Sequence, residues 1–209
     1  MLHTISWMVT LAPEPARPRA CTRVLRWFIC GGIAGGAVMG AVIALAAREL
    51  AHVVGSLPTI SVAGAALLAV IYAGHEANVW HVPRPQFGHQ VPEAWRKIFS
   101  PGTASFLYGF GLGTIYLTRL GSLVAYPLVF LLLGMGRTPG AITAVMAAVG
   151  LVRTSAAFLI PFLRLEDANS QAVLALMRKY SGPAKRGELL TLLLVPVFLA
   201  AGLLANYVL

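Results

Sequence analysis

The sequence predicts an all-α membrane protein, a polytopic bundle of about six transmembrane helices. One observation is composition: 58% of the 209 residues are hydrophobic, 11% are charged and the mean hydropathy is +0.78, whereas about a quarter of the residues are charged in ordinary soluble proteins. The other is the length of the apolar runs, because a helix needs about 20 apolar residues to cross a bilayer. A backbone in hydrocarbon must satisfy its own hydrogen bonds, so these runs are expected to be helical.

The first apolar run, residues 27–47, contains no charged side chain and places Gly32, Gly36 and Gly40 at four-residue spacing. On a helix these glycines share one face, where the backbone of a neighbouring helix can approach closely. The run exceeds the apolar core of a signal sequence, about 7 to 15 residues, so we expect it to remain as the first helix. Residues 1–26 combine prolines with arginines and are expected to form a disordered basic arm on the cytoplasmic side of a bacterial membrane.

Five further apolar runs complete the expected single transmembrane domain, residues 27–209. They cover residues 59–80, 101–118, 120–136, 140–162 and 189–209. Gly109 and Gly113 give the run 101–118 a second close-packing face. Through such glycine-rich faces we expect the chain to bind a second copy of itself or a partner membrane protein.

A weak internal repeat favours two related halves. Pro58 and Pro139 each precede a span, and the segment 96–101 is echoed in 178–183. Halves of three spans each would face opposite ways in the membrane, which is the inverted-repeat plan of many small transporters.

The charge distribution conflicts with six crossings. Six crossings place the five basic residues of 163–188 on the outer side, against the positive-inside rule. An alternative treats 101–136 as one broken or re-entrant element that crosses once, which returns 163–188 to the cytoplasm. Those 36 residues are too long for one ordinary span, so six spans remain the prediction.

The net charge of +9 lies mainly in the segments that flank the apolar runs. This placement indicates topogenic charge and contact with anionic lipid headgroups, and we expect no nucleic-acid partner. The two cysteines, Cys21 and Cys30, do not form a disulfide framework. We expect no cofactor.

Arg153 is the sharpest candidate for a functional residue, because it lies within the apolar run 140–162. An arginine at the centre of a span costs about 2.5 to 3.5 kcal/mol on insertion scales, so it should face a partner or a watery cavity. Glu49, Glu76 or a bound anion is expected to be that partner. The alternative is a structural ion pair or a side chain that snorkels to the membrane surface.

Polar residues at the end of the first span form a second candidate. Arg48 and His52 lie four residues apart on one helical face, with Glu49 between them. Inside the bundle they would form a functional polar cluster, whereas beyond the span they would be solvated. Arg119, where a turn between two spans is expected, joins Arg153, Arg48 and His52 as a candidate contact for a solute.

The segment 74–90 holds three of the five histidines, together with Glu76. His75 and His81 are six residues apart, which gives no metal-ligand pattern on a helix, so we expect no metal site. An interfacial loop anchored by Trp80 is the preferred interpretation. His75, Glu76 and Glu49 remain the candidates for catalytic groups.

The segments Pro83-x-Pro85-Gln86, Gln90-Val91-Pro92-x-x-Trp95 and Leu107-Tyr108-Gly109-Phe110-Gly111-Leu112-Gly113-Thr114 resemble small membrane proteins related to the CcdA/DsbD transmembrane family and the wider LysE-type permeases. The resemblance covers residues 27–209 by architecture and 83–114 by motif. Thiol-relay members use one cysteine in each half. This chain has Cys30, but Gly111 stands at the corresponding position in the second half, so the resemblance implies the scaffold and not electron transfer.

From these observations the leading hypothesis is a permease-like protein that moves a small solute past Arg153, and an arginine favours an anionic one. One alternative is a membrane-embedded enzyme that acts on a lipid or isoprenoid through Glu76, His75, Glu49 and Arg153. Another is a non-catalytic assembly subunit held to a partner by its glycine faces.

Overall fold

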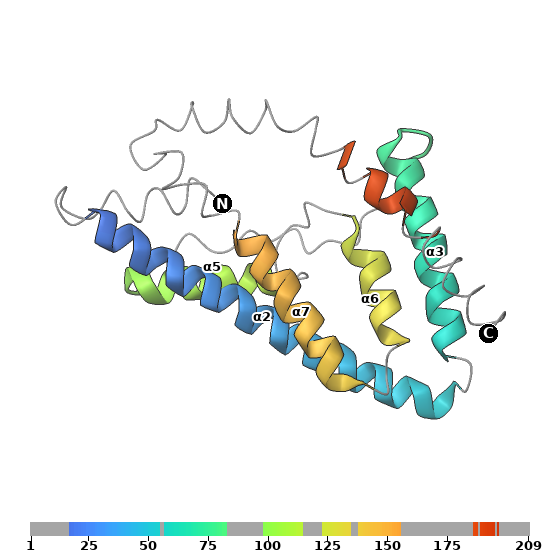
Figure 1. The fold of residues 1–209 in the computed structure, drawn as a ribbon, viewed down its shortest axis with the longest axis horizontal. Coiled ribbons are helices and arrows are strands. Elements are labelled where there is room, and N and C mark those ends of the chain that lie inside the picture. Colours follow the sequence, from blue (N-terminus) through green and yellow to red (C-terminus); the bar gives the residue numbers. More distant parts are fainter. Residues whose placement is uncertain are drawn as a thin grey trace. The chain divides into compact units, whose positions relative to one another are not determined.

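A computed structural model of the chain describes residues 17–54, 57–82, 98–114, 123–134 and 138–155, and further on 186–187, 189–194 and 196. Over these residues the secondary structure is helical and contains no strand (Figure 1). Its main helices are α2 (Arg17–Val53), α3 (Leu57–Glu76), α5 (Pro101–Gly113), α6 (Ala125–Leu133) and α7 (Pro139–Ser155). The all-α prediction is therefore confirmed for this part of the chain.

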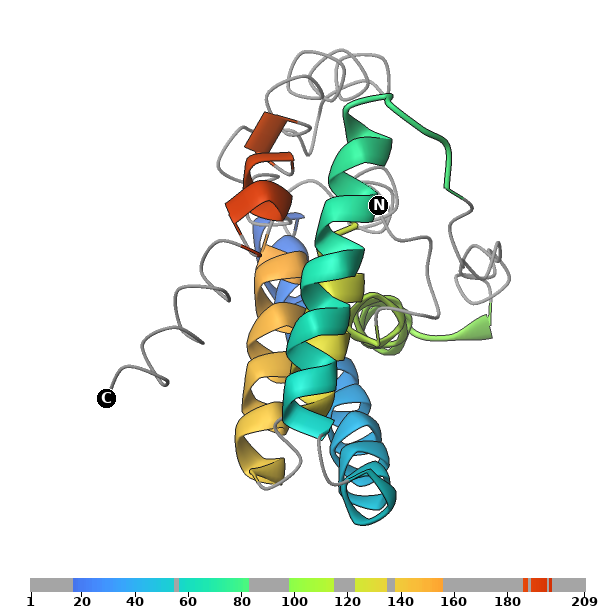
Figure 2. The ribbon, with the colours of Figure 1, turned by 90° about the vertical axis from the view of Figure 1, so that its right-hand side faces the viewer.

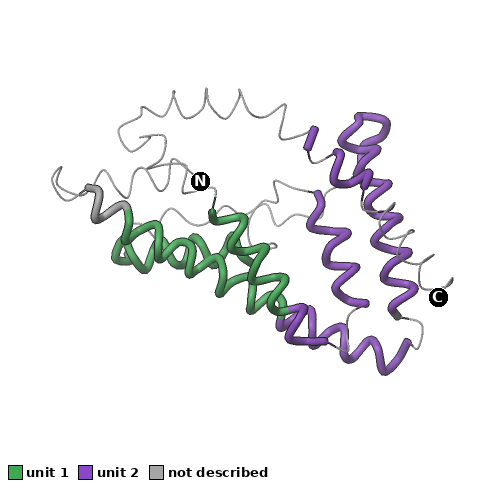
Figure 3. Tube along the Cα trace, in the orientation of Figure 1, with its two compact units in different colours: residues 1–40, 86–119, 143–179 green, residues 41–85, 120–142, 180–209 purple. Residues whose placement is uncertain are grey.

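The chain divides into two compact units (Figure 3). Unit 1 comprises residues 1–40, 86–119 and 143–179, and unit 2 comprises residues 41–85, 120–142 and 180–209. Helix α2 contributes its first part to unit 1 and its last part to unit 2, and no proline interrupts it between Pro18 and Val53.

Two helices have the length and apolar composition of a membrane span, Thr22–Val53 within α2 and Pro58–Glu76 within α3. Signal sequences near an N-terminus and core helices of soluble proteins share both properties. Helices α5 and α6, with 13 and 9 residues, reach only about 20 and 14 Å at 1.5 Å per residue, against a hydrocarbon thickness of about 30 Å. The predicted six-span bundle is not confirmed, and most of the run 189–209 lies outside the described residues.

Helix α2 is longer than the predicted first span. It contains 37 residues, about 55 Å at 1.5 Å per residue, and begins at Arg17, inside the segment expected to be a basic arm. Pro18 falls in its first turn, where a proline removes no helical hydrogen bond. Residues 1–16 lie outside the described part of the chain.

In unit 1, α5 runs parallel to α2 and α7 runs antiparallel to it. Gly109 of α5 approaches Phe28 of α2, and Gly113 approaches Gly32 and Gly36. Residue numbers therefore rise in the same direction along both helices. The order on α7 is reversed. There Thr154 meets Gly32, and the backbone of Met146 meets Gly36.

This direction of α7 disagrees with six alternating crossings. In that plan the runs 27–47, 101–118 and 140–162 are the first, third and fifth crossings and point the same way. In unit 1, helix α7 points opposite to α2. The inverted arrangement of two three-span halves does not fit this direction.

In unit 2, α3 and α6 lie side by side and run antiparallel (Figures 1 and 2). Three pairs of contacting residues set this direction: Gly134 with Ser61, Phe130 with Gly64, and Tyr126 with Tyr72. The rings of the two buried tyrosines stack at 4.9 Å with an interplanar angle of 25°. Spans two and four of a six-crossing bundle would run parallel, so unit 2 gives the same result as unit 1.

Pro127 stands in the first turn of α6. It is the third residue of α6 and is fully buried, and in a first turn the absent N–H leaves no helical hydrogen bond unmade. At the end of α5, Thr114 is the C-cap residue.

Small side chains are buried in α3 while large aliphatic ones are exposed. Ala65 and Ala69 are 0% exposed, whereas Leu67 is 61% and Val70 is 49% exposed. A soluble protein rarely leaves large apolar faces in water. Small residues between helices and aliphatic residues outside are the arrangement expected in lipid.

Candidate functional site

The most tightly packed part of unit 1 is the contact between α2 and α5. A Cβ added to Gly31 or Gly35 would overlap the backbone carbonyls of Phe106 and Phe110, and a Cβ on Gly109 would overlap the carbonyl of Phe28. The helices therefore meet backbone to backbone, at a separation that only glycine permits.

A second contact joins α2 to α7. A Cβ on Gly36 would overlap the Met146 carbonyl, and one on Gly32 would overlap the Thr154 side chain. On the α7 side, Gly150 presses against the carbonyl of Gly32. We call these two contacts together the glycine seam: Gly31, Gly32, Gly35, Gly36, Gly109, Gly113 and Gly150.

Gly32 is the centre of the glycine seam. A Cβ on Gly113 of α5 and a Cβ on Gly150 of α7 would both overlap its carbonyl oxygen. Two helices thus converge on one peptide group from different sides. Packing of this kind fixes the three helices as a scaffold and leaves no room for a ligand between them.

Hydroxyl groups beside the seam form hydrogen bonds within their own helices. Thr154 Oγ1 donates to the carbonyl oxygen of Gly150 at 2.8 Å, and Thr114 Oγ1 donates to that of Gly111 at 2.9 Å. Ser155 Oγ donates to the carbonyl oxygen of Val152 at 2.7 Å. Such bonds let polar side chains sit in apolar surroundings without a partner from another helix.

Arg153 differs from its polar neighbours. In the described part of the chain its Nη1 is the one buried side-chain nitrogen or oxygen atom without a hydrogen-bond partner. The residue lies in the last described turn of α7 and is partly exposed. A buried guanidinium nitrogen without an acceptor is costly, and none of the described residues supplies an acceptor to Arg153 Nη1.

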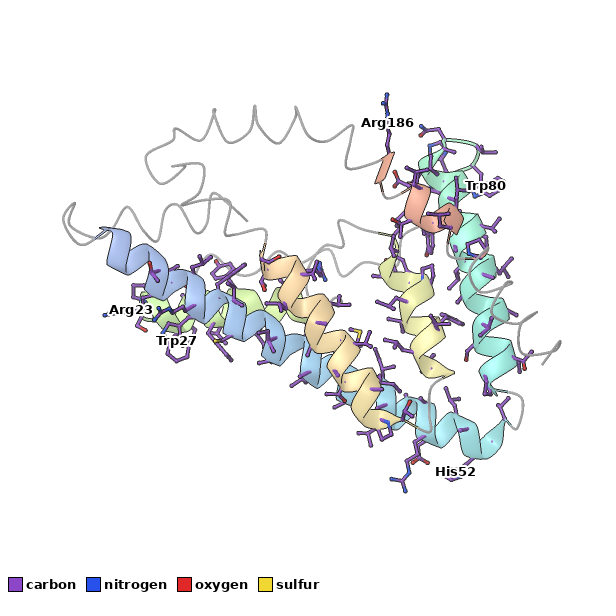
Figure 4. All side chains as sticks on the ribbon, viewed as in Figure 1. Arg23, Trp27, His52, Trp80 and Arg186 are labelled. Carbon is purple, nitrogen blue, oxygen red and sulfur yellow. The ribbon has the colours of Figure 1, made fainter. Side chains whose placement is uncertain are left out.

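The predicted partners of Arg153 lie in the other unit. Glu49 and Glu76 belong to unit 2, and Arg153 belongs to unit 1. Glu49 and the preceding residue Arg48 are exposed. His52, which is labelled in Figure 4, is exposed as well. Arg119 lies outside the described residues. Their roles as solute contacts or catalytic groups remain predictions.

The end of α3 is a compact turn. The Val79 N–H donates to the Gly74 carbonyl oxygen at 2.9 Å, and the Asn78 N–H donates to the His75 carbonyl oxygen at 3.1 Å. Asn78 has a φ of 59°, the left-handed conformation that closes a helix in a Schellman motif. The Trp80 side chain is held against helix α3, because its Nε1 donates to the Ile71 carbonyl oxygen at 2.7 Å.

This turn brings two histidines of the segment 74–90 together. His75 and His81 would point apart on a continuous helix, but α3 ends at Glu76 and the chain doubles back. The two rings lie edge to face, 6.0 Å between centroids, and the Val82 N–H donates to His75 Nδ1 at 3.0 Å. Within the described residues no three His, Cys, Asp or Glu side chains are grouped to bind a metal ion.

The sequence contained a signal for the two-sided seam that spacing alone missed. The four-residue spacing of Gly32, Gly36 and Gly40 indicated one face, but the doublets Gly31-Gly32 and Gly35-Gly36 supply two adjacent faces. Neighbouring helical positions are about 100° apart, so in each doublet the Cβ position of the first glycine faces α5 and that of the second faces α7.

No family model and no solved structure matches this chain. Curated proteins named methylamine utilization protein MauF are similar to it. The relative from Methylobacillus flagellatus is 30% identical over 145 residues, which is 66% of this chain and 49% of the relative. That from Methylophilus methylotrophus is 32% identical over 117 residues, 55% and 40% of the two chains, and that from Methylorubrum extorquens 30% over 115 residues, 54% and 40%. The chain spans at most about half the length of these relatives.

These similarities correct two predictions. The resemblance to the CcdA/DsbD family and the LysE-type permeases is wrong, because the matching proteins carry the MauF name. The permease and transport hypothesis is wrong for the same reason, and the alternative of a non-catalytic assembly subunit fits the relatives better. The physical reason for the error is that glycine-rich apolar helices indicate close packing in lipid, and many unrelated membrane proteins share that property.

Proposed function

We propose that this chain is a membrane-embedded, non-catalytic subunit that assembles with a partner protein in methylamine utilization. The observation that carries the proposal is the similarity of 66% of the chain to a methylamine utilization protein at 30% identity. The partner is another membrane protein, and the chain provides a helical scaffold for it.

The packing of unit 1 supports a scaffold. The three helices meet through glycines whose added Cβ atoms would overlap neighbouring backbone, and the hydroxyls of Thr154 and Thr114 are bonded within their own helices. Tight backbone contact of this kind makes a rigid body suited to holding a partner.

The exposed aliphatic side chains support a place in the membrane. On α2, Val38, Val42 and Leu45 are 50%, 52% and 62% exposed, and the stretch Thr22–Val53 is long enough to cross a bilayer. Lipid acyl chains would cover this surface without cost. We place the N-terminal arginines on the cytoplasmic side of the bacterial cytoplasmic membrane, following the positive-inside rule.

Helix direction supports a topology with one crossing between residues 101 and 136. Helix α7 runs opposite to α2, and α5 and α6 are each too short to cross alone. In this proposal α5 and α6 are two parts of one broken crossing. The basic segment 163–188 then lies on the cytoplasmic side, as its charge requires.

The proposal is tested in the native host by deleting the gene and by purifying a tagged copy from its membranes in mild detergent. We expect the deletion strain to lose growth on methylamine while it keeps growth on a carbon and nitrogen source that contains no methylamine. The tagged chain, expressed at native level, should recover a second membrane protein in stoichiometric amount. Unchanged growth on methylamine together with recovery of the chain alone would refute the proposal.

A further inference from the structure

Arg153 Nη1 is buried and has no hydrogen-bond partner among the described residues. We propose that Arg153 is the docking point for a partner membrane protein, which supplies a carboxylate from one of its apolar helices. This inference rests on the proposed function and adds to it the residue and the chemistry of the contact.

The described part of unit 1 offers Arg153 no carboxylate. The described part of unit 1, residues 22–40, 98–114 and 143–155, contains no Asp or Glu. Arg153 Nη1 is nevertheless buried, and it has no hydrogen-bond partner. An uncompensated buried charge is strongly unfavourable, whereas a carboxylate in contact with it removes most of that penalty.

The surroundings of Arg153 favour a carboxylate over a phosphate. The adjacent hydroxyls of Thr154 and Ser155 donate to carbonyl oxygens of α7, so they are not free to bind further phosphate oxygens. Arg153 is also the one cation in residues 138–155, whereas lipid headgroups are bound by clusters of basic residues. A single guanidinium fork matches the two oxygens of one carboxylate.

The face of α7 beside Arg153 suits an apolar helix. Ala144, Ala148 and Val152 follow one another at four-residue spacing and are all exposed, while Met146 and Thr154 on the opposite face are buried against α2. Arg153 lies between the two faces. Small residues on the exposed face let a second helix come close enough for its carboxylate to reach the guanidinium.

The test uses the complex purified from native membranes and a cross-linker of zero length. A membrane-permeant carbodiimide joins an amine to a carboxylate in direct contact, so an Arg153→Lys variant should cross-link to the partner. The matched control is Val38→Lys, because Val38 is 50% exposed on α2, outside the face of Ala144, Ala148 and Val152, and it should not give this product. An Arg153→Ala variant should recover at least ten-fold less partner while its own yield and its helical circular dichroism stay at the wild-type level.

The cross-linked residue decides the proposal. A bond from the Arg153→Lys variant to an Asp or Glu in an apolar helix of the partner, identified by mass spectrometry, supports it. A bond to an acid of this chain, no bond at all, or full partner recovery by Arg153→Ala overturns it. An anionic phospholipid that native mass spectrometry finds on the wild type and not on Arg153→Ala overturns it in favour of a headgroup. Absence of any partner on the wild type refutes the proposed function itself.

Discussion

The carbonyl oxygen of Gly32 in α2 occupies the space where a Cβ of Gly113 in α5 would stand. On another side, the same oxygen occupies the Cβ position of Gly150 in α7. One peptide group thus sets how closely three helices can approach, and any side chain added there must move backbone. The glycine seam is therefore the part of the chain where a single methyl group should have the largest effect.

Gly113→Ala should destabilise the protein by about 1 to 3 kcal/mol, the usual cost of overpacking, because the new Cβ meets the Gly32 backbone and not a flexible side chain. Thermal unfolding in detergent, followed by helical circular dichroism, measures the effect. Gly140→Ala is the matched control, since a Cβ there has nothing within 4 Å, and it should leave the transition unchanged or raise it. Equal stability of the two variants would contradict close backbone packing at the glycine seam.

Gly32→Ala should be partly rescued by Thr154→Ala. The added Cβ would overlap the Thr154 side chain, which the second substitution removes, but it also meets the Gly150 carbonyl oxygen at 2.9 Å. We therefore expect a coupling of about 1 kcal/mol, within the range found for residues in contact, and incomplete recovery. The four proteins of the double-mutant cycle are compared by their unfolding midpoints. Strict additivity would show that α7 does not pack on Gly32.

Asn78→Ala should destabilise the turn after α3 by about 1 kcal/mol, because Asn78 has a φ of 59° and alanine tolerates the left-handed conformation poorly. Asn78→Gly is the control and should be neutral or slightly stabilising, since glycine is the preferred residue at this position of a Schellman motif. Amide hydrogen exchange of residues 74–82 reports the local opening. A glycine variant that exchanges as fast as the alanine variant would exclude this explanation.

Cysteines introduced at residues 10 and 175, in a background without Cys21 and Cys30, should both react with a membrane-impermeant maleimide only after the cytoplasmic side is opened. The reason is that α7 runs antiparallel to α2 in unit 1. The N-terminal end of α2 and the C-terminal end of α7 are therefore expected on the same side of the membrane. Reaction of residue 175 from the outside of intact cells would restore the six-crossing plan. The N-terminal cysteine serves as the internal control for sidedness.

The sequence determined the helical class and the places of closest packing. In hydrocarbon a long apolar run has to satisfy its backbone hydrogen bonds within itself, as a helix does. Glycines at helical spacing mark the places where another helix backbone can make contact. The predicted faces at Gly32 and Gly36 in α2, and at Gly109 and Gly113 in α5, do form such contacts. These properties follow from local chemistry, which a sequence displays directly.

Only the tertiary structure decided helix direction and the partners of the polar groups. Hydrophobicity is the same whichever way a helix points, so it could not show that α7 runs antiparallel to α2. Nor could spacing along a continuous helix show that the chain turns after Glu76 and brings His81 back to His75. The lack of an acceptor for Arg153 Nη1 is likewise a fact about neighbours in space, and these depend on how distant segments pack against each other.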